Sequence, residues 1–232
     1  MNTKRVINCL IFSKDRAMQL DALLNSIQKN LTQDSDIFWF DILYQATSPA
    51  FLEAYTILRK QYPEFVFLRE RNFEDDFRLW LRDLISDDYV MFLVDDDIFY
   101  DSIPKVEKIP WSFRPGDFDY LFALDGCVYK ARVIIRLLDF RFKNPSDLEA
   151  GFFKKSGKFS FKLNRSTPCV VGVHANRVSD SPGAPFFGGA DWSALRLNQM
   201  YLSGKRIDLE ATLKSVEITD THQEIRYEFT DS

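Results

Sequence analysis

Short apolar runs alternate with helix-like segments over about the first 100 residues, and this order constrains the fold more than any other feature of the sequence. Residues 6–12, 37–44, 66–68 and 89–94 are apolar or β-branched runs of the length expected for strands. Between these runs, apolar residues recur at helical spacing. Strands and helices in this order form right-handed βαβ units, so the sequence predicts an α/β fold with a mainly parallel central sheet flanked by helices.

Two of the intervening helices carry start signals. Ser48 is a favoured N-cap residue, and the Pro49 that follows it is well suited to the first helical position. Asn72 is placed to cap a helix whose first turn contains three acidic residues, which suit the positive end of the helix dipole. We therefore expect helices to begin directly after Ser48 and Asn72.

The second half of the chain has a less regular pattern. Strands are expected at 120–124 and 170–173, and helices at 129–138, from Asp147 onward and at 192–202. Residues 176–190 include two prolines and three glycines, a composition typical of a long flexible loop.

Composition excludes several classes of protein. The 232 residues carry a formal net charge of −4, which argues against a general nucleic-acid binder. The three cysteines are far apart and form no CxxC pair, so a disulfide framework or a structural zinc site is not expected, and a reducing compartment, the cytoplasm, fits. The apolar run near the N-terminus is too short for a signal peptide or a transmembrane segment.

Charge is distributed unevenly along the chain. Residues 64–97 contain 11 acidic and 4 basic side chains, whereas residues 129–165 contain 3 acidic and 10 basic ones. Both stretches are compatible with solvated faces. A second interpretation is that the acidic stretch holds a divalent cation and that the basic stretch faces an anionic acceptor or makes peripheral contact with a membrane surface.

Three consecutive carboxylates, Asp95, Asp96 and Asp97, directly follow the apolar run 89–94. Neighbouring carboxylates repel one another, so their ionised state calls for a compensating cation, and oxygen ligands at this density suit Mg²⁺ or Mn²⁺. The alternative is a solvated acidic turn. Residues 13–16 also follow a predicted strand, and ligands of parallel sheets bind beyond the carboxyl ends of strands. We expect residues 13–16 and 95–97 to face the same crevice.

The strand 89–94 followed by the acidic triplet resembles the DxD motif of nucleotide-sugar glycosyltransferases of the GT-A type. The opening CLIFSKDRAMQLDALLNSI looks like the first strand, donor loop and first helix of bacterial family-2-like members. Segments 124–127 and 147–149 are similar to the acceptor-side loop and acidic helix start of that family, whereas the QxxRW signature of its processive members is absent. The resemblance implies a GT-A-like, Rossmann-type fold in one domain, 1–232, with a donor half at 1–100 and an acceptor half at 101–232.

The resemblance also implies roles for individual residues. Asp97 would hold a Mn²⁺ or Mg²⁺ ion on the diphosphate of a UDP- or GDP-sugar, with Asp95 nearer the ribose and Asp96 assisting. His222 is a further candidate metal ligand, because some members of the wider fold use a late histidine. The donor pocket would be lined by Ser13, Lys14, Asp15 and Arg16, together with Arg71 and Arg78. Arginine suits phosphate because its planar fork donates two parallel hydrogen bonds.

Sugar transfer to an acceptor hydroxyl on a glycan, lipid or protein usually needs a general base. Glu149 is the first candidate for this base and Asp147 the second, because a carboxylate within hydrogen-bond reach can remove the developing proton. The alternative is that both side chains only stabilise the start of a helix. The alternative functions are a non-catalytic nucleotide- or sugar-binding module derived from such an enzyme and a nucleotidyltransferase, although the glycine-rich loop and signature lysine of the latter are missing.

Overall fold

The central sheet has five strands in the order β3-β2-β1-β4-β6. In this computed structural model the first four strands run parallel and β6 is antiparallel to β4. Their bounds are β1 (Val6–Lys14), β2 (Ile37–Gln45), β3 (Val66–Arg69), β4 (Tyr89–Val94) and β6 (Val128–Lys130). The residues that the structure describes are 6–31, 37–84, 89–102, 124, 126–156, 169–173, 176, 192–214, 222–223 and 226–231.

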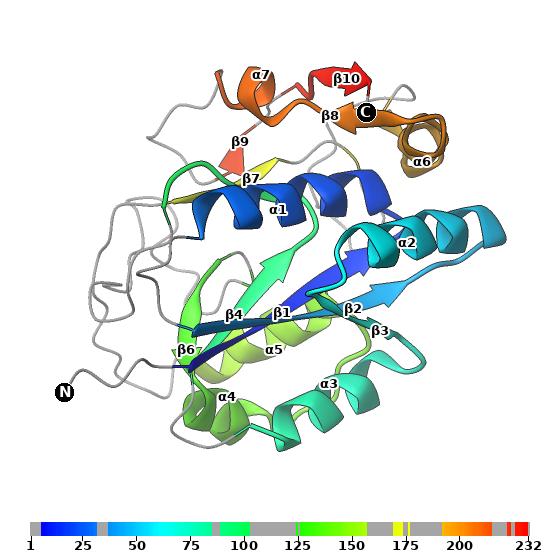
Figure 1. The fold of residues 1–232 in the computed structure, drawn as a ribbon. Helices are drawn as coiled ribbons and strands as arrows, with labels where there is room; N and C mark the ends of the chain where they lie inside the picture. Colours follow the sequence, from blue (N-terminus) through cyan, green and yellow to red (C-terminus); the bar gives the residue numbers. More distant parts are fainter. Residues whose placement is uncertain are drawn as a thin grey trace.

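Helices cover both faces of this sheet (Figure 1). One face is covered by α1 (Ala17–Asn30) and α2 (Pro49–Gln61). The opposite face is covered by α3 (Phe73–Arg82), α4 (Ala131–Leu137) and α5 (Pro145–Ser156). The predicted α/β fold with a mainly parallel sheet between two helical layers is therefore confirmed.

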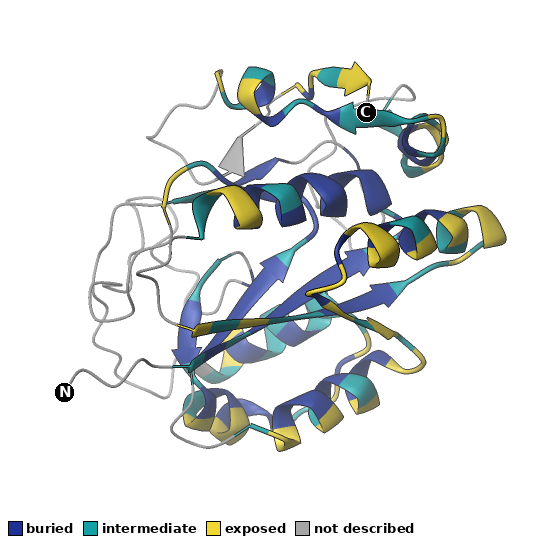
Figure 2. Cartoon of the chain, viewed as in Figure 1, coloured by how far each residue is buried: buried dark blue, intermediate teal, exposed yellow. Residues whose placement is uncertain are grey.

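A further layer from the C-terminal part of the chain lies over α1 (Figure 1). It contains α6 (Ala194–Leu202), β8 (Lys205–Ile207), α7 (Leu209–Leu213) and β10 (Phe229–Asp231), and β8 pairs with β10 in an antiparallel ladder. Because the sheet and this layer enclose α1 from two sides, ten of its fourteen residues are buried (Figure 2). The start of α1 is thereby held firmly against the sheet.

A second, three-stranded sheet begins where β4 ends. It contains β5 (Asp97–Phe99), β7 (Val170–Val173) and β9 (His222–Gln223) in the order β5-β7-β9. β5 is antiparallel to β7, and β7 is parallel to β9. The chain thus leaves the main sheet at the acidic triplet and enters the smaller sheet at Asp97.

Aromatic rings fill the space between the main sheet and the layer of α3, α4 and α5. The rings of Phe12, Phe73, Phe77 and Phe92 lie with neighbouring centroids 5.4–6.3 Å apart, and Phe142 adds edge-on contacts. Such tilted and edge-on pairs favour the ring quadrupoles and bury much apolar surface. The 22 phenylalanines of the sequence are explained in part by this cluster.

The expected strands at 6–12, 37–44, 66–68, 89–94 and 170–173 are confirmed, with β1 continuing to Lys14. The caps are confirmed as well, since Ser48 Oγ accepts a hydrogen bond from Phe51 N, and Asn72 Oδ1 accepts one from Asp75 N. These local signals were sufficient because each is decided by neighbouring residues in the chain.

The boundaries predicted in the second half needed correction. The helix expected at 129–138 begins only at Ala131, because Val128–Lys130 pairs with β4 and closes the edge of the sheet. The helix expected from Asp147 begins at Pro145, because Asn144 Oδ1 accepts a hydrogen bond from Asp147 N and so acts as its cap. The helix expected at 192–202 begins at Ala194 after the cap Ser193. Residues 120–123 and 177–190 lie outside the described part of the chain.

None of the helices in the described segments combines the length and the hydropathy that crossing a lipid bilayer requires.

We predict that Phe77→Ala lowers the free energy of unfolding by about 3–5 kcal/mol, because it removes a fully buried ring from the aromatic cluster. The matched control is Leu79→Ala on the same helix, whose side chain is 50% exposed and whose loss is expected to cost less than about 1 kcal/mol. Urea denaturation of both variants measures the difference. Equal losses would show that α3 does not pack as described.

Candidate functional site

Residues 13–16 and 95–97 meet at the point where the strand order of the main sheet reverses. From β1 the chain passes through α1 to β2 and then through α2 to β3, and both strands lie on one side of β1. The next strand, β4, lies on the other side of β1. The carboxyl ends of β1 and β4 are therefore neighbours, and ligands of open α/β sheets bind at such switch points. We call residues 13–16 and 95–97 the switch-point site.

Hydrogen bonds show that the two segments of this site lie together. Ser13 Oγ donates to Asp95 Oδ2 at 2.8 Å, and Lys14 N donates to the same oxygen at 3.2 Å. The Ser13 hydroxyl is also 2.6 Å from the hydroxyl of Tyr55, a residue of α2. Tyr55 belongs to the apolar stripe of its helix, so its helical spacing indicated a core residue and gave no sign of a contact with the site.

Arg16 lies between the carboxylates of Asp95 and Asp96. Its Nη1 is 2.9 Å from Asp95 Oδ1 and 2.9 Å from Asp96 Oδ2, and its Nη2 donates to the backbone carbonyl of Asn176. Burial lowers the pKa of Arg16, but the charges of Asp96 and Asp95 outweigh it and raise that pKa above its usual value. The guanidinium is therefore a fixed positive charge inside the site.

This arrangement changes the charge balance expected from the sequence. The triplet calls for a compensating cation, and the chain supplies one itself in Arg16. Burial, together with repulsion from Asp96, raises the pKa of Asp95 to about 6 even though Arg16 and Ser13 act in the opposite direction. The switch-point site as a whole has two cationic side chains, Lys14 and Arg16, against four carboxylates, so an excess of negative charge remains and the site favours a further cation.

Asp96 and Asp97 fix the turn between β4 and β5. The Asp96 carbonyl accepts a hydrogen bond from Val173 N at 2.8 Å, and Asp97 Oδ2 accepts one from Val94 N at 2.9 Å. Asp97 is 1% exposed, so it is the most deeply buried member of the triplet. Its carboxylate helps to shape the turn that presents the other two.

The small sheet places His222 in register with Asp97. Asp97 pairs with Gly172 of β7, and Gly172 pairs in turn with His222 of β9. Adjacent strands are about 4.8 Å apart, so the two residues lie roughly 10 Å apart along this row, and the residue between them is a glycine.

Asp15 supports the loop from an unusual backbone conformation. Its φ is 56°, in the left-handed region that Asp and Asn tolerate better than most residues. Its carboxylate accepts hydrogen bonds from Thr47 N at 2.8 Å and from Thr47 Oγ1 at 2.6 Å. Asp15 thus joins the loop after β1 to the loop after β2.

The two arginines expected at the donor pocket differ in their surroundings. Arg71 is exposed just beyond β3, at the carboxyl-terminal end of the parallel strands, where residues 13–16 also lie. Its guanidinium has no ion pair within the described segments. Arg78 donates from Nε to Glu74 at 2.9 Å and from its two other nitrogens to the carbonyls of Leu138 and Phe140. These contacts give Arg78 a structural role in joining α3 to the segment after α4.

Glu149 and Asp147 lie at the start of α5. Glu149 Oε1 accepts a hydrogen bond from Leu124 N at 3.2 Å. Leu124 is close to Gly126, whose N–H donates to the Phe92 carbonyl of β4. Glu149 therefore reaches a segment that runs beside the carboxyl-terminal half of β4, whereas Asp147 contributes its backbone N–H to the helix cap.

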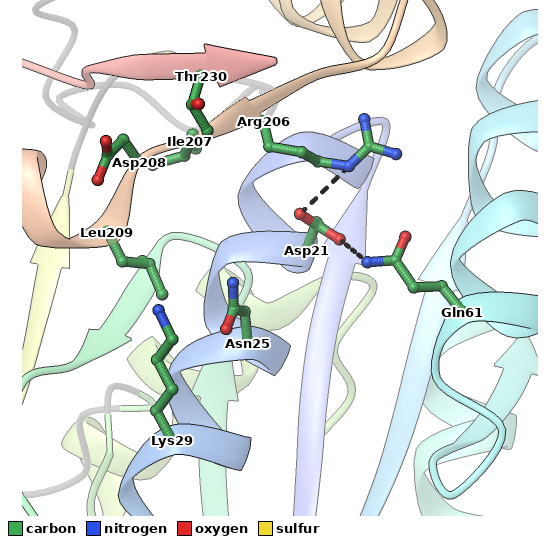
Figure 3. A pocket seen from close by; sticks show the side chains of 9 residues that line it. All are labelled: Asp21, Asn25, Lys29, Gln61, Arg206, Ile207, Asp208, Leu209 and Thr230. Carbon is green, nitrogen blue, oxygen red and sulfur yellow. Dashed lines mark hydrogen bonds and ion pairs between the residues drawn. The ribbon is translucent and has the colours of Figure 1, made fainter. Parts of the chain in front are cut away.

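A separate cavity of about 450 Å³ lies between α1 and the C-terminal layer (Figure 3). Asp21 of α1 accepts hydrogen bonds there from Gln61 at 3.0 Å and from the hydroxyl of Tyr62 at 3.1 Å, and it lies 3.7 Å from Arg206 Nε. Burial raises the pKa of Asp21, opposed by Arg206. These contacts join α1 to α2 and to β8.

The oxygen atoms of the switch-point site are of the kind that bind a hard divalent cation. Among the described residues, no three His, Cys, Asp or Glu side chains are grouped as a complete metal site. Mg²⁺ at phosphate-binding sites is commonly held by only one or two carboxylates, with phosphates and water completing its shell. Asp95 and Asp96 already converge on one cationic nitrogen, so they fit such a partial site.

Part of the chain is similar in sequence to a known protein. No protein-family model matches the chain. Over 99 residues, 40% of this chain, it is 33% identical to the bifunctional glycosyltransferase pgtA of Dictyostelium discoideum. The matched segment spans only 13% of that protein. This similarity supports the resemblance to glycosyltransferases, and the assignment to bacterial family-2-like members stays a prediction.

Solved structures with some likeness to the fold are also glycosyltransferases. The mannosyltransferase PcManGT from Pyrobaculum calidifontis, solved with GDP-Man and Mn²⁺, has a TM-score of 0.48 at 13% identity over 72% of this chain and 55% of that chain. The galactosyltransferase LgtC, solved with donor and acceptor sugar analogs, has a TM-score of 0.42 at 15% identity over 84% of this chain and 95% of that chain.

We predict that Asp15→Ala destabilises the protein by about 1–3 kcal/mol more than Asp15→Asn. Asparagine tolerates the left-handed backbone and keeps an acceptor for Thr47, whereas alanine leaves the Thr47 donors without their partner. Thermal and urea unfolding of the two variants measure the difference. Equal stability of both variants would contradict the supporting role of the Asp15 side chain.

Proposed function

We propose that the chain is a glycosyltransferase that moves a sugar from a nucleotide-diphosphate sugar, a UDP- or GDP-sugar, to an acceptor hydroxyl. The observation that carries this proposal is the meeting of residues 13–16 with the acidic residues 95–97 at the switch point of the sheet. The sequence similarity to a glycosyltransferase over 99 residues supports it. The acceptor is a glycan, a lipid or a protein.

The donor is proposed to bind across the carboxyl ends of β1 and β4. Ser13, Lys14, Asp15 and Arg16 line one side of this position, and Asp95 and Asp96 line the other. Arg71 has an exposed guanidinium at the same edge and is the better of the two arginine candidates for the base or the diphosphate. Arg78 already uses three nitrogens on Glu74 and two backbone carbonyls, so we propose it as a structural residue in place of a donor ligand.

Donor binding is proposed to involve Mn²⁺ or Mg²⁺ held by Asp95 and Asp97, with His222 as a further ligand. The register of Asp97, Gly172 and His222 supports this set, because it brings the late histidine into the same row as Asp97. A divalent cation, when bound, supplies positive charge that stabilises a departing diphosphate. The protein contributes the buried carboxylates, held in place by Ser13, Lys14 N and Val94 N.

The acceptor hydroxyl is proposed to lose its proton to Glu149, with Asp147 as the second candidate. The contact of Glu149 with Leu124 N places its carboxylate near the segment beside β4. A carboxylate at this position needs only hydrogen-bond reach to the acceptor oxygen to act as a general base.

The acceptor half, 101–232, is proposed to be distinct from the donor half, 1–100, and its basic stretch 129–165 to face the acceptor or a membrane surface. Part of that charge is already paired, since Lys155 contacts Asp139 and Arg141 contacts Glu74.

A cytoplasmic location is proposed because all three cysteines carry free thiols. A thermal-shift screen of sugar nucleotides, with and without Mn²⁺, tests the proposed function and identifies the donor.

We predict that UDP or GDP binds tightly only when a divalent cation is present and that Asp97→Asn removes most of this binding. The asparagine keeps an acceptor for Val94 N, so the turn is retained while the charge is lost. Asp101→Asn, in the exposed segment after β5, is the matched control and should bind as the wild type does. Calorimetry measures each affinity, and equal affinity in EDTA and in Mn²⁺ would refute metal dependence.

We predict that Glu149→Gln keeps donor affinity but lowers the rate of transfer by roughly 10²–10⁴-fold, the usual range for a lost general base. The glutamine retains an oxygen that accepts from Leu124 N, so the loss is chemical and not structural. Asp147→Asn is the control and should lose far less. A parallel fall in donor binding and turnover for Glu149→Gln would assign the residue to structure or to nucleotide binding.

A further inference from the structure

The side chain of Arg16 occupies a position that a metal ion would share. One nitrogen, Nη1, lies 2.9 Å from oxygens of both Asp95 and Asp96. A divalent cation bound through either carboxylate would therefore lie within a few ångströms of the guanidinium.

Burial strengthens the interaction between charges at this short distance. The side chain of Arg16 is 11% exposed, and those of Asp95 and Asp96 are 4% and 5% exposed. Charges in such surroundings are screened much less by water and salt than charges on the surface. A divalent cation and the guanidinium would repel each other strongly while both contact Asp95. Each should therefore weaken the binding of the other.

The main chain of Arg16 is held by hydrogen bonds, so its side chain is the part that can move away from the carboxylates. Arg16 N donates to the Tyr55 hydroxyl at 3.3 Å, and the Arg16 carbonyl accepts a hydrogen bond from Leu20 N in the first turn of α1. That helix is enclosed by the sheet and the C-terminal layer. The guanidinium reaches the carboxylates from the end of this rigid support, and its rotation is the simplest way to release them.

A diphosphate offers the guanidinium a replacement partner. The planar fork of arginine fits phosphate oxygens as well as it fits carboxylates. A nucleotide diphosphate bound at the switch-point site would thus attract Arg16 away from Asp95 and Asp96 and free the Asp95 carboxylate for a cation.

We propose that Arg16 is an internal cation that competes with the divalent metal for Asp95, the carboxylate that both would contact, and that a nucleotide diphosphate relieves this competition by binding the guanidinium. The metal then binds weakly to the protein alone and tightly together with the nucleotide. This inference rests on the metal-assisted donor binding proposed above. It gives Arg16 a role in ordering the binding of metal and donor.

The test is a titration of the full chain with Mn²⁺ alone. Calorimetry and the electron paramagnetic resonance signal of free Mn²⁺ both measure the binding. Arg16→Gln removes the competing charge and should bind Mn²⁺ about tenfold or more tightly than the wild type, within the usual range of coupling between two sites. Arg59→Gln, an exposed arginine on α2, is the matched control and should bind Mn²⁺ as the wild type does. Unchanged or weaker Mn²⁺ binding by Arg16→Gln overturns the competition.

A second titration measures Mn²⁺ binding in the presence of saturating UDP or GDP. The nucleotide should raise the Mn²⁺ affinity of the wild type by a larger factor than that of Arg16→Gln, because in the variant there is no guanidinium left to displace. Equal factors overturn the proposed relief of competition. If UDP and GDP bind to the wild type while Arg16→Gln gains no Mn²⁺ affinity, the inference fails and the proposed function stands. If the wild type binds neither nucleotide, the proposed function fails as well.

If Arg16→Gln does not fold, Arg16→Lys tests the same competition. An ammonium group cannot reproduce the fork that joins both carboxylates and the Asn176 carbonyl, so the substituted side chain competes less well and Mn²⁺ affinity should rise by a smaller factor. Added Mn²⁺ should also raise the melting temperature of either variant more than that of the wild type, since a ligand stabilises the state that binds it. Wild-type Mn²⁺ affinity in Arg16→Lys, with no added thermal stabilisation, overturns the proposal.

Discussion

The contact of Arg16 with Asp95 and Asp96 is the interaction on which the geometry of the site depends. It joins the loop after β1 to the loop after β4 at distances of 2.9 Å and adds the backbone of Asn176 as a third partner. Without a positive charge at this point, the buried carboxylates would repel each other and the turn that leads into β5 would lose its support. We propose that the same contact also controls how readily the site accepts another cation.

The rest of the fold holds this contact in place. Arg16 stands directly before α1, and α1 is covered on one side by the main sheet and on the other by α6, α7, β8 and β10 (Figure 2). Asp21, one turn further along α1, is bound to Gln61 and Tyr62 and lies near Arg206. The C-terminal layer therefore packs on α1 from the side opposite the main sheet.

The sequence was sufficient to predict the strands of the first half, because buried parallel strands are continuous apolar runs, and to place residues 13–16 and 95–97 together, because both follow such strands. It did not predict the ion pair itself, since Arg16 and Asp95 are 79 residues apart and arginine fits a phosphate as well as a carboxylate. β6 was missed because its three residues have too little pattern to be distinguished from the helix that follows them. The roles of Tyr55 and of Asn176 depend on tertiary contacts that local spacing does not encode.

The most direct test of the account is a crystal structure of the protein with UDP or GDP and Mn²⁺, chosen by the nucleotide screen. We predict that the diphosphate lies beyond the carboxyl ends of β1 and β4, within hydrogen-bond reach of residues 13–16, with Mn²⁺ between it and the acidic triplet. A nucleotide bound elsewhere, for example in the cavity beside Asp21, would contradict the central claim that the switch-point site is the donor site.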